Sequence, residues 1–363
     1  MARIDFESVA HAYSAQPRGP QDYALKPLRF AFEDGGAYAL LGPSGCGKTT
    51  LLNIISGLLQ PSEGRVLFDG RDVTRLAPAQ RNIAQVFQFP VIYDTMTVGE
   101  NLAFPLRNRG VAPAAVAKRV AEVAAMLDLE PLLKRRAAGL SADQKQKISL
   151  GRGLVREDVA AILFDEPLTV IDPHLKWLLR RKLKEVHNRF RHTLVYVTHD
   201  QNEALTFAHK VVVMYEGEVV QLGTPQDLFE RPAHRFVGYF IGSPGMNFVP
   251  CRLEGGAVRI EGTDIALGQH WAKAAGEVPG AALELGIRPE FVSLAAGPGA
   301  MTVPAELERV DDLGNYKLVS ARLGPHRLMA KLSEDAEVPG SGPAHLAFVP
   351  ARTLLYADGR LIG

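Results

Sequence analysis

The sequence has little cysteine, no long apolar run and almost no net charge. Cys46 and Cys251 are the only cysteines among 363 residues, which excludes a disulfide framework and indicates a reducing compartment. No stretch approaches the roughly 18 apolar residues of a membrane span, and residues 1–13 lack the apolar core of a signal peptide. The net charge of +1 argues against a general nucleic-acid binder. We therefore expect a chain that does not cross a membrane by itself and does not bind nucleic acid.

What the sequence does contain is typical of a globular protein with room for two domains. Apolar residues make up 47% of the chain and charged residues 22%. From Gly242 onward, glycine, proline and short alternating segments replace the mixture of helical and strand-like patterns that precedes it. We place the junction at Ser243-Pro244-Gly245. This predicts a first domain over residues 1–242 and a small all-β, barrel-like domain over residues 243–363.

The most informative stretch reads GPSGCGKTT and matches the pattern G-x-x-x-x-G-K-[ST]. The apolar segment 37–41 predicts a strand before it, and residues 51–59 predict a helix after it. A glycine turn between strand and helix directs backbone N–H groups into one concavity, and the helix start adds its positive dipole end. Lys48 would charge-pair with β- and γ-phosphates, and Thr49 would offer a hydroxyl to Mg²⁺. We therefore predict a nucleotide phosphate loop made of Gly42, Pro43, Ser44, Gly45, Cys46, Gly47, Lys48, Thr49 and Thr50.

Two further apolar segments end in residues that suit phosphate chemistry. Segment 160–165 ends in Asp165-Glu166-Pro167, as expected of a buried parallel strand whose carboxyl end meets a metal and phosphate site. Asp165 would hold Mg²⁺ and Glu166 would polarise the attacking water. Segment 194–198 ends at His199, which can hydrogen-bond a γ-phosphate or that water. The alternatives are an exposed acidic turn and a structural histidine.

An aromatic residue upstream of the phosphate loop is expected to stack on adenine. Tyr13 is the candidate and Tyr23 is the rival, and the alternative for Tyr13 is packing at the end of strand 4–10. Downstream, the pattern predicts helices over residues 114–129, 145–154 and 175–190, a loop over residues 89–101 and Ser141 as a helix N-cap. The basic helix 175–190 is interpreted as a solvated helix on the sheet.

Taken in order, these motifs resemble the ATP-binding cassette ATPases, and specifically the subunits that power bacterial importers of the maltose and glycerol-phosphate type. Residues 42–49 match the Walker A motif, and residues 161–166 match Walker B with its catalytic glutamate. Gln88, Asp172, His199 and Tyr13 match the Q-loop glutamine, the D-loop aspartate, the switch histidine and the adenine-stacking aromatic, although Thr-Val-Ile-Asp replaces the usual small-residue D-loop. The stretches at 242–248 and 286–290 resemble the family's C-terminal regulatory domain, which is OB-like and of the TOBE type.

The resemblance implies the fold and the chemistry. The fold is α/β, a P-loop nucleotide-binding domain with a mixed, mainly parallel sheet and a helical subdomain at about residues 89–158, followed by a small all-β OB-like domain. The substrate would be ATP and the cofactor Mg²⁺, with Thr49, Gln88 and Asp165 on the metal. The catalytic residues would be Glu166, His199, Gln88 and Lys48.

The resemblance also implies partners. Two such ATPases dimerise head to tail, so that each ATP lies between one subunit's phosphate loop and the other's signature motif. They would drive two transmembrane permease subunits from the cytoplasmic face of the membrane, where the chain would be peripheral, and an extracytoplasmic solute-binding protein would deliver the solute. The region from Gln88 to Asn101 would touch the permease. The sequence leaves sugar, polyol and phosphorylated polyol open as solutes.

The signature motif departs from the family pattern. Leu140-Ser141-Ala142-Asp143-Gln144 replaces Leu-Ser-Gly-Gly-Gln, so Ser141, Asp143 and Gln144 are the residues expected to face the partner's ATP. At about 5 Å and an effective dielectric near 20, one like-charge pair between Asp143 and a phosphate costs roughly 3 kcal/mol. This predicts a heterodimer with a second, non-identical ATPase whose signature is complete. The alternatives are a homodimer that tolerates Asp143 and a regulatory subunit that hydrolyses ATP poorly. A DNA-repair type of cassette is disfavoured, because no long coiled coil is inserted.

Overall fold

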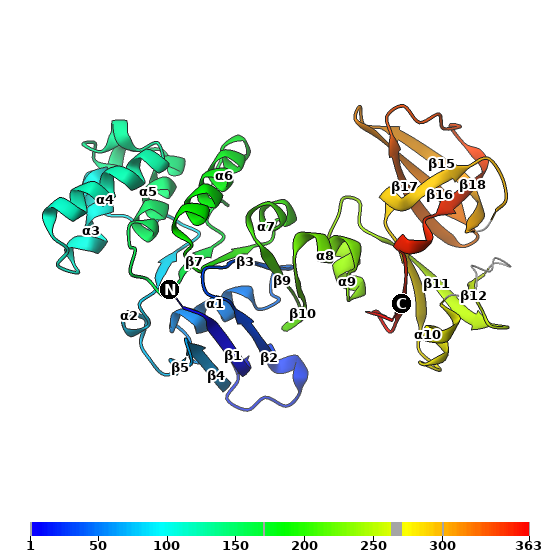
Figure 1. Cartoon of the computed structure of the whole chain (residues 1–363), viewed down its shortest axis with the longest axis horizontal. Coiled ribbons are helices and arrows are strands. Elements are labelled where there is room, and N and C mark those ends of the chain that lie inside the picture. The colour runs from blue at the N-terminus through cyan, green and yellow to red at the C-terminus, as the bar shows by residue number, and fades with distance from the viewer. Residues whose placement is uncertain (1, 170, 263–270, 300, 363) are drawn as a thin grey trace. The chain divides into compact units, whose positions relative to one another are not determined.

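The computed structural model describes residues 2–169, 171–262, 271–299 and 301–362, and these form two compact units over 1–225 and 226–363. The first unit contains two sheets, and helix α1 (Lys48–Ser56) lies between them (Figure 1). The second unit includes the helices α8 (Pro225–Glu230) and α9 (Arg235–Phe240), which precede residue 242. The domain boundary predicted between residues 242 and 243 stays a prediction.

The larger sheet of the first unit is mixed and mainly parallel, as predicted. Its strands, in spatial order, are β10 (Glu218–Gly223), β9 (Lys210–Tyr215), β3 (Ala37–Leu41), β8 (Leu194–Thr198), β7 (Ile162–Asp165) and β6 (Ala84–Val86). Only β10, which forms a hairpin with β9, is antiparallel to its neighbour within this sheet. The carboxyl ends of β3, β6, β7 and β8 therefore lie at one edge, where a phosphate site is expected.

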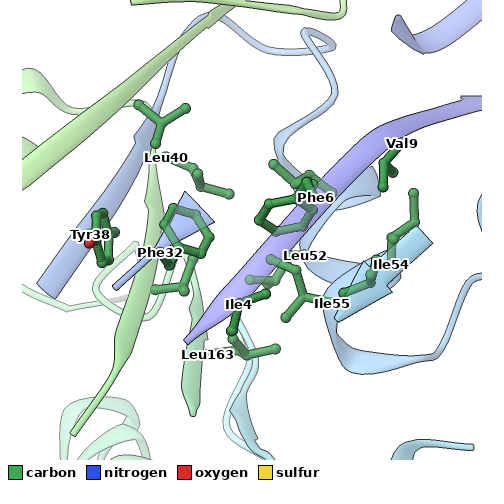
Figure 2. Packing of buried hydrophobic residues seen from close by; sticks show 14 of the residues in the cluster. Ile4, Phe6, Val9, Phe32, Tyr38, Leu40, Leu52, Ile54, Ile55 and Leu163 are labelled. Carbon is green, nitrogen blue, oxygen red and sulfur yellow. The ribbon is translucent and has the colours of Figure 1, made fainter. Parts of the chain in front are cut away.

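The smaller sheet is antiparallel and covers the other side of α1. Its strands are β2 (Tyr23–Phe32), β1 (Ile4–Ala12), β4 (Glu63–Phe68) and β5 (Arg71–Asp72). Figure 2 shows Ile4 and Phe6 of β1 against Leu52 of α1, with Leu163 of β7 beside them. These side chains are almost fully buried, so the core packs α1 between the two sheets.

Helices form a subdomain of the first unit, inside the region 89–158 that the resemblance indicates. It contains α3 (Val98–Arg107), α4 (Pro113–Met126) and α5 (Ala142–Leu154), which pack on one another away from the small sheet (Figure 1). The remaining helices of the unit are α2 (Pro78–Arg81), α6 (Pro173–Phe190) and α7 (Gln201–Phe207), with 3-10 turns at Pro20–Asp22, Glu130–Leu132 and Ala137–Gly139.

One prediction in this region is wrong. Residues 89–101 were expected to form a loop, but α3 begins at Val98. Thr97 caps the helix by accepting a hydrogen bond from the Glu100 N–H at 3.2 Å, while the Glu100 carboxylate accepts one from the Thr97 N–H at 2.7 Å. This T-x-x-E capping box is a local signal that starts a helix despite the mixed polarity around it.

The second unit is a β domain that follows the helices α8 and α9 in the chain, and its β architecture confirms the prediction. One sheet contains β12 (Ala257–Ile260), β11 (Asn247–Glu254), β13 (Leu283–Ile287), β19 (Thr353–Ala357) and β20 (Arg360–Leu361); the other contains β14 (Val292–Ala295), β18 (Gly342–Phe348), β15 (Thr302–Asp312), β16 (Tyr316–Leu323) and β17 (His326–Ser333). The helix α10 (Ala272–Gly276) and 3-10 turns at Pro289–Phe291 and Pro350–Arg352 complete it. The inner faces of both sheets share one apolar cluster.

Candidate functional site

The phosphate loop connects β3 to α1, and its glycines are required by the backbone. A Cβ on Gly42 would lie 2.2 Å from the carbonyl oxygen of Met214. Gly47 has φ of +102°, and a Cβ there would lie 2.6 Å from the carbonyl oxygen of Ala24. Gly45 also has positive φ, but its Cβ position faces open space. The first turn of α1 carries no acidic side chain, so nothing from this helix neutralises its positive end.

Lys48 is the first residue of α1 and its ammonium lies across the loop. Its Nζ donates hydrogen bonds to the carbonyl oxygens of Gly42 at 2.9 Å and of Pro43 at 2.8 Å. The side chain is buried, whereas Ser44 and Gly45 are exposed. Cys46 is buried beside Lys48, and burial raises the pKa of its thiol, so it is a neutral packing residue. The loop is therefore a shallow cradle with one cation at its base.

Asp165 ends β7 directly opposite this cradle. Burial is the main cause that raises the pKa of Asp165, and the neighbouring Glu166 raises it further. Lys48 and a hydrogen bond from the Thr49 hydroxyl act in the opposite direction. A carboxylate next to a hydroxyl is a set of hard oxygen donors that suits Mg²⁺. In the described part of the chain no three His, Cys, Asp or Glu side chains gather as metal ligands, so any ion here needs hydroxyl, amide or phosphate oxygens as well.

Gln88 could supply the amide oxygen. It is half-buried and follows β6, whose residue Val86 is paired in parallel with Phe164 of β7. The Gln88 and Asp165 positions therefore lie at the same edge of the sheet, one strand apart. Its assignment as a metal and catalytic residue stays a prediction, as do the roles of Thr49 and Asp165.

Glu166 and His199 meet at the same edge. Nδ1 of His199 lies 3.2 Å from Oε2 of Glu166. Glu166 has φ of +45°, an uncommon conformation for a residue with a side chain, and its N–H donates to the carbonyl oxygen of Val197 at 3.1 Å. The Thr169 hydroxyl donates to the Glu166 carboxylate at 3.3 Å. The backbone is thus held so that this carboxylate turns toward His199.

The turn that carries His199 is fixed by its neighbours. Asp200 caps α7 by accepting hydrogen bonds from the N–H groups of Asn202 at 2.8 Å and Glu203 at 3.4 Å. Thr198 donates to the buried Glu203 carboxylate at 2.8 Å and accepts from the Asp200 N–H at 3.0 Å. His199 itself is more than half exposed and is therefore accessible to a ligand.

Tyr13 lies next to the phosphate loop, whereas Tyr23 has a different partner. The Tyr13 hydroxyl is 3.0 Å from Oγ1 of Thr50, and 68% of the residue is exposed. The His11 ring meets it edge-on at 4.7 Å. Tyr23 donates to the Glu63 carboxylate at 2.6 Å. An exposed ring held beside the loop is what stacking on a base requires, and this role for Tyr13 remains a prediction.

The signature residues form the N-terminus of α5. Ser141 caps the helix: its Oγ accepts from the Gln144 N–H at 3.5 Å, and the Gln144 side chain accepts from the Ser141 N–H at 3.2 Å. The Ser141 hydroxyl donates to the Asp143 carboxylate. The carbonyl oxygen of Asp172, the predicted D-loop residue, accepts hydrogen bonds from the N–H groups of Leu175 and Lys176 at the start of α6. Val170 of the same loop lies outside the described residues.

Sequence reasoning missed three polar side chains that hold the backbone on either side of Gln88. Asn101 is fully buried and its amide bonds both the N–H of Tyr93 at 2.8 Å and its carbonyl oxygen at 2.9 Å. Arg152 donates to the carbonyl oxygen of Val91 at 2.6 Å and stacks on the Tyr93 ring at 4.8 Å. Gln146, also fully buried, bonds the carbonyl oxygens of Phe87 and Pro167. The capping box at Thr97 could have revealed α3. The bonds of Gln146 and Arg152 join segments between 21 and 61 residues apart and leave no local signal.

Comparison with known proteins agrees with this geometry. Residues 25–169 match the family model described as ABC transporter, and residues 242–292 match the MalK OB fold domain. The chain is 39% identical over 332 residues to the sn-glycerol-3-phosphate import ATP-binding protein UgpC of Bordetella avium (strain 197N), covering 91% of this chain and 89% of that protein. It is 37% identical over 362 residues to the protein of the same name in Escherichia coli O157:H7, covering 99% of this chain and 98% of that protein.

Solved structures agree as well. The cbiO1 protein from Clostridium perfringens, part of the transporter complex cbiONQ, matches with a TM-score of 0.57 and 27% identity over 63% of this chain and 90% of its own. The ATP-binding cassette MJ0796, a dimer bound to ADP and phosphate, matches with a TM-score of 0.54 and 28% identity over 61% of this chain and 98% of its own. The described residues contain no helix long and apolar enough to cross a membrane. The chain therefore belongs to the ATP-binding proteins of ABC transporters, and it is an importer ATPase that couples ATP hydrolysis to uptake.

Proposed function

We propose that ATP is hydrolysed at the edge where the phosphate loop, Asp165, Glu166 and His199 meet. The observation that supports this most is the 3.2 Å contact between Glu166 and His199 at the ends of neighbouring strands. The loop N–H groups and the start of α1 bind the phosphates, and Lys48 turns from its two carbonyl partners to the β- and γ-phosphates. Glu166 polarises the attacking water, and His199 orients it or the γ-phosphate. Thr49, Gln88 and Asp165 would hold a Mg²⁺ ion, which would neutralise charge on the phosphates when bound.

The solute we propose is a phosphorylated polyol of the sn-glycerol-3-phosphate class. The support is the name of the near full-length relatives, and the MalK OB fold match of residues 242–292 agrees with an importer of this broad class. Right-side-out membrane vesicles that contain the chain with its permease and its solute-binding protein should accumulate labelled sn-glycerol-3-phosphate when ATP is inside. Uptake of labelled maltose under the same conditions, with no uptake of the phosphate ester, would contradict the assignment.

The partners we propose are two permease subunits and an extracytoplasmic solute-binding protein, with the chain peripheral on the cytoplasmic face of the membrane. Phe89 is 68% exposed and Val91 is 55% exposed directly after Gln88. Two cavities of about 280 and 260 Å³ are both lined by Gln85, Phe87 and Arg156, and the smaller one is also lined by Val91. Exposed apolar side chains around a cavity suit a short helix of the permease.

We further propose that the chain pairs with a second, non-identical ATPase. Asp143 accepts the Ser141 hydroxyl at the start of α5, which is the place where the family's signature meets the partner's γ-phosphate. A carboxylate there repels phosphate and occupies the serine donor, so the site completed by this signature would be slow. The homodimer that tolerates Asp143 is the alternative. The proposal fails if the importer, purified through its permease, contains this ATPase alone in two copies.

Turnover measurements test the role of Asp143 directly. We expect the purified chain to hydrolyse ATP slowly, and Asp143→Gly and Asp143→Asn to gain turnover that rises cooperatively with protein concentration. Asp143→Asn keeps the size of the side chain and removes only its charge, so it separates repulsion from crowding. Cooperative hydrolysis by the unmodified chain, with no change in either variant, would instead support the homodimer.

A further inference from the structure

The side chain of Gln146 joins the two segments that carry the proposed catalytic residues. Its Nε2 donates to the carbonyl oxygen of Phe87 at 3.3 Å and to that of Pro167 at 2.7 Å. Phe87 directly precedes Gln88, and Pro167 directly follows Glu166. An amide nitrogen has two hydrogens, and here each one serves a different strand end. One side chain therefore spans the carboxyl edges of β6 and β7.

The burial of Gln146 indicates that this position is not chosen for packing. The residue is 0% exposed, and its Oε1 has no hydrogen-bond partner within the described ranges. A buried acceptor without a partner destabilises the folded state, and a methionine of similar size would not carry that cost. What the glutamine provides and methionine cannot is the pair of N–H donors.

Gln146 lies on α5, the helix that begins with the signature residues. Two other side chains of α5 hold the segment after Gln88. Lys145 pairs with Asp94 at 3.0 Å, and Arg152 donates to the Val91 carbonyl at 2.6 Å. The backbone on both sides of Gln88 is therefore bonded to α5. A shift of α5 along its axis moves Phe87, Val91 and the end of β7 together.

We propose that Gln146 is a positioning residue for hydrolysis, which fixes Gln88 and Glu166 relative to each other and to the signature helix. The side chain is fully buried, so it would act through Gln88 and Glu166 rather than on the nucleotide or the water itself. Without its two donors, the strand ends separate and Glu166 loses its alignment with the γ-phosphate, while the phosphate loop on α1 still binds ATP. This inference rests on the proposed roles of Gln88 and Glu166.

The test uses the assembled importer in membrane vesicles, with ATP turnover and ATP binding measured for each variant. Gln146→Met keeps the size and removes both donors, and we expect kcat to fall between about 10- and 100-fold with KM for ATP within about twofold, as for misaligned catalytic groups. Ile148→Val, two residues along the same buried helix, is the control for loss of packing and should keep kcat.

A second variant distinguishes positioning from structure. In Gln146→Glu, the protonated carboxyl can donate to one carbonyl and the ionised form to neither. We expect its kcat, relative to wild type, to rise as the pH falls from about 8 to about 6, because burial raises the pKa of a carboxyl and lower pH favours the protonated form that can donate. A purely structural role predicts a kcat per folded enzyme that follows wild type at every pH.

The outcomes separate the inference from the function on which it rests. If Gln146→Met turns over ATP like Ile148→Val while Glu166→Gln is inactive, the positioning role is wrong and the proposed site stands. If Glu166→Gln keeps wild-type turnover, the proposed site is wrong and the inference falls with it. Loss of kcat in Gln146→Met with the pH-dependent recovery of Gln146→Glu supports the inference.

Discussion

Nδ1 of His199 lies 3.2 Å from Oε2 of Glu166, although the two residues come from different strands. The strands β7 and β8 are parallel neighbours, paired from Ile162 with Leu194 to Asp165 with Val197, so their carboxyl ends bring both side chains to one edge. The positive φ of Glu166 completes the approach. Such backbone strain at a polar site is typical of residues held for catalysis rather than for folding.

The first prediction concerns the Glu166 carboxylate. We expect Glu166→Gln to lower kcat between about 100- and 10,000-fold, because the amide cannot accept a proton from the attacking water. ATP binding should persist, since the phosphate loop is unchanged. Phosphate release and binding of a fluorescent ATP analogue measure the two effects, and Glu185→Gln on the exposed face of α6 is the control. Turnover close to that of Glu185→Gln would exclude Glu166 as the general base.

The second prediction separates Tyr13 from Tyr23. We expect Tyr13→Ala to raise KM for ATP roughly 5- to 150-fold, the range given by base stacking on an aromatic ring. Tyr13→Phe should change KM little, because the ring remains and only the contact with Thr50 is lost. Tyr23→Ala is the matched control, since Tyr23 bonds Glu63 instead. If Tyr23→Ala has the larger effect, the assignment of the adenine-stacking residue is reversed.

Local patterns predicted the elements of this site, but not the contacts that hold them. The phosphate loop and the acids after β7 were predictable because each depends on a few consecutive residues between a strand and a turn or helix. The expectation that these residues lie close together at the carboxyl edge of the sheet required only that the strands be parallel. The T-x-x-E box at Thr97 is a readable local signal, yet the predicted loop over residues 89–101 includes the first turn of α3.

Other features depend on residues far apart in the chain. Gln146 bonds partners 59 and 21 residues away, so nothing in its neighbourhood distinguishes it from a surface glutamine of a polar helix. Asp143 and Ser141 are only two residues apart, but the hydrogen bond between their side chains depends on the backbone conformation at the start of α5. Sequence motifs thus identify the residues that are expected to contact ligands, whereas the residues that hold them in place can be identified only from the three-dimensional structure.

The third prediction concerns stability in acid. His187 and His192 are almost fully buried at the end of α6 and the start of β8, and burial is the main cause that lowers the pKa of each to about 4. His209, Arg191 and Arg119 lower these values further. Because the unfolded chain binds these protons more readily, stability is complete above about pH 6.5 and is lost as the pH falls toward 4. The difference corresponds to at most about 3 kcal/mol per histidine.

Urea unfolding of the full chain at several pH values measures this loss. His187→Phe should flatten the dependence between about pH 6.5 and 4, because one proton fewer is taken up on unfolding. His326→Gln, whose imidazole rests on the Glu261 carbonyl in the second unit, is the control. An identical pH slope in wild type and His187→Phe would show that other groups cause the acid sensitivity.

The fourth prediction concerns Arg288 in the second unit. Its guanidinium is fully buried, stacks on Phe229 at 4.1 Å and donates to the carbonyl oxygens of Leu228 at 3.2 Å and Ile241 at 2.5 Å. It also bonds the carbonyl oxygens of Phe229 and Gly238, so one side chain ties α8 and α9 to the strand that it follows. Burial lowers its pKa to about 10, which still leaves it charged at neutral pH.

We expect Arg288→Lys to destabilise the second unit by about 3 kcal/mol or more, since lysine cannot reach carbonyls in several directions and leaves buried acceptors unpaired. Calorimetric unfolding of the full chain measures this, and ATP binding reports that the first unit is still folded. The control, Arg327→Lys, changes an exposed pair with Glu308 and should cost less than about 1 kcal/mol. Equal melting curves for the two variants would mean that the carbonyl cluster is satisfied without the guanidinium, and that α8 and α9 are held by their apolar contacts instead.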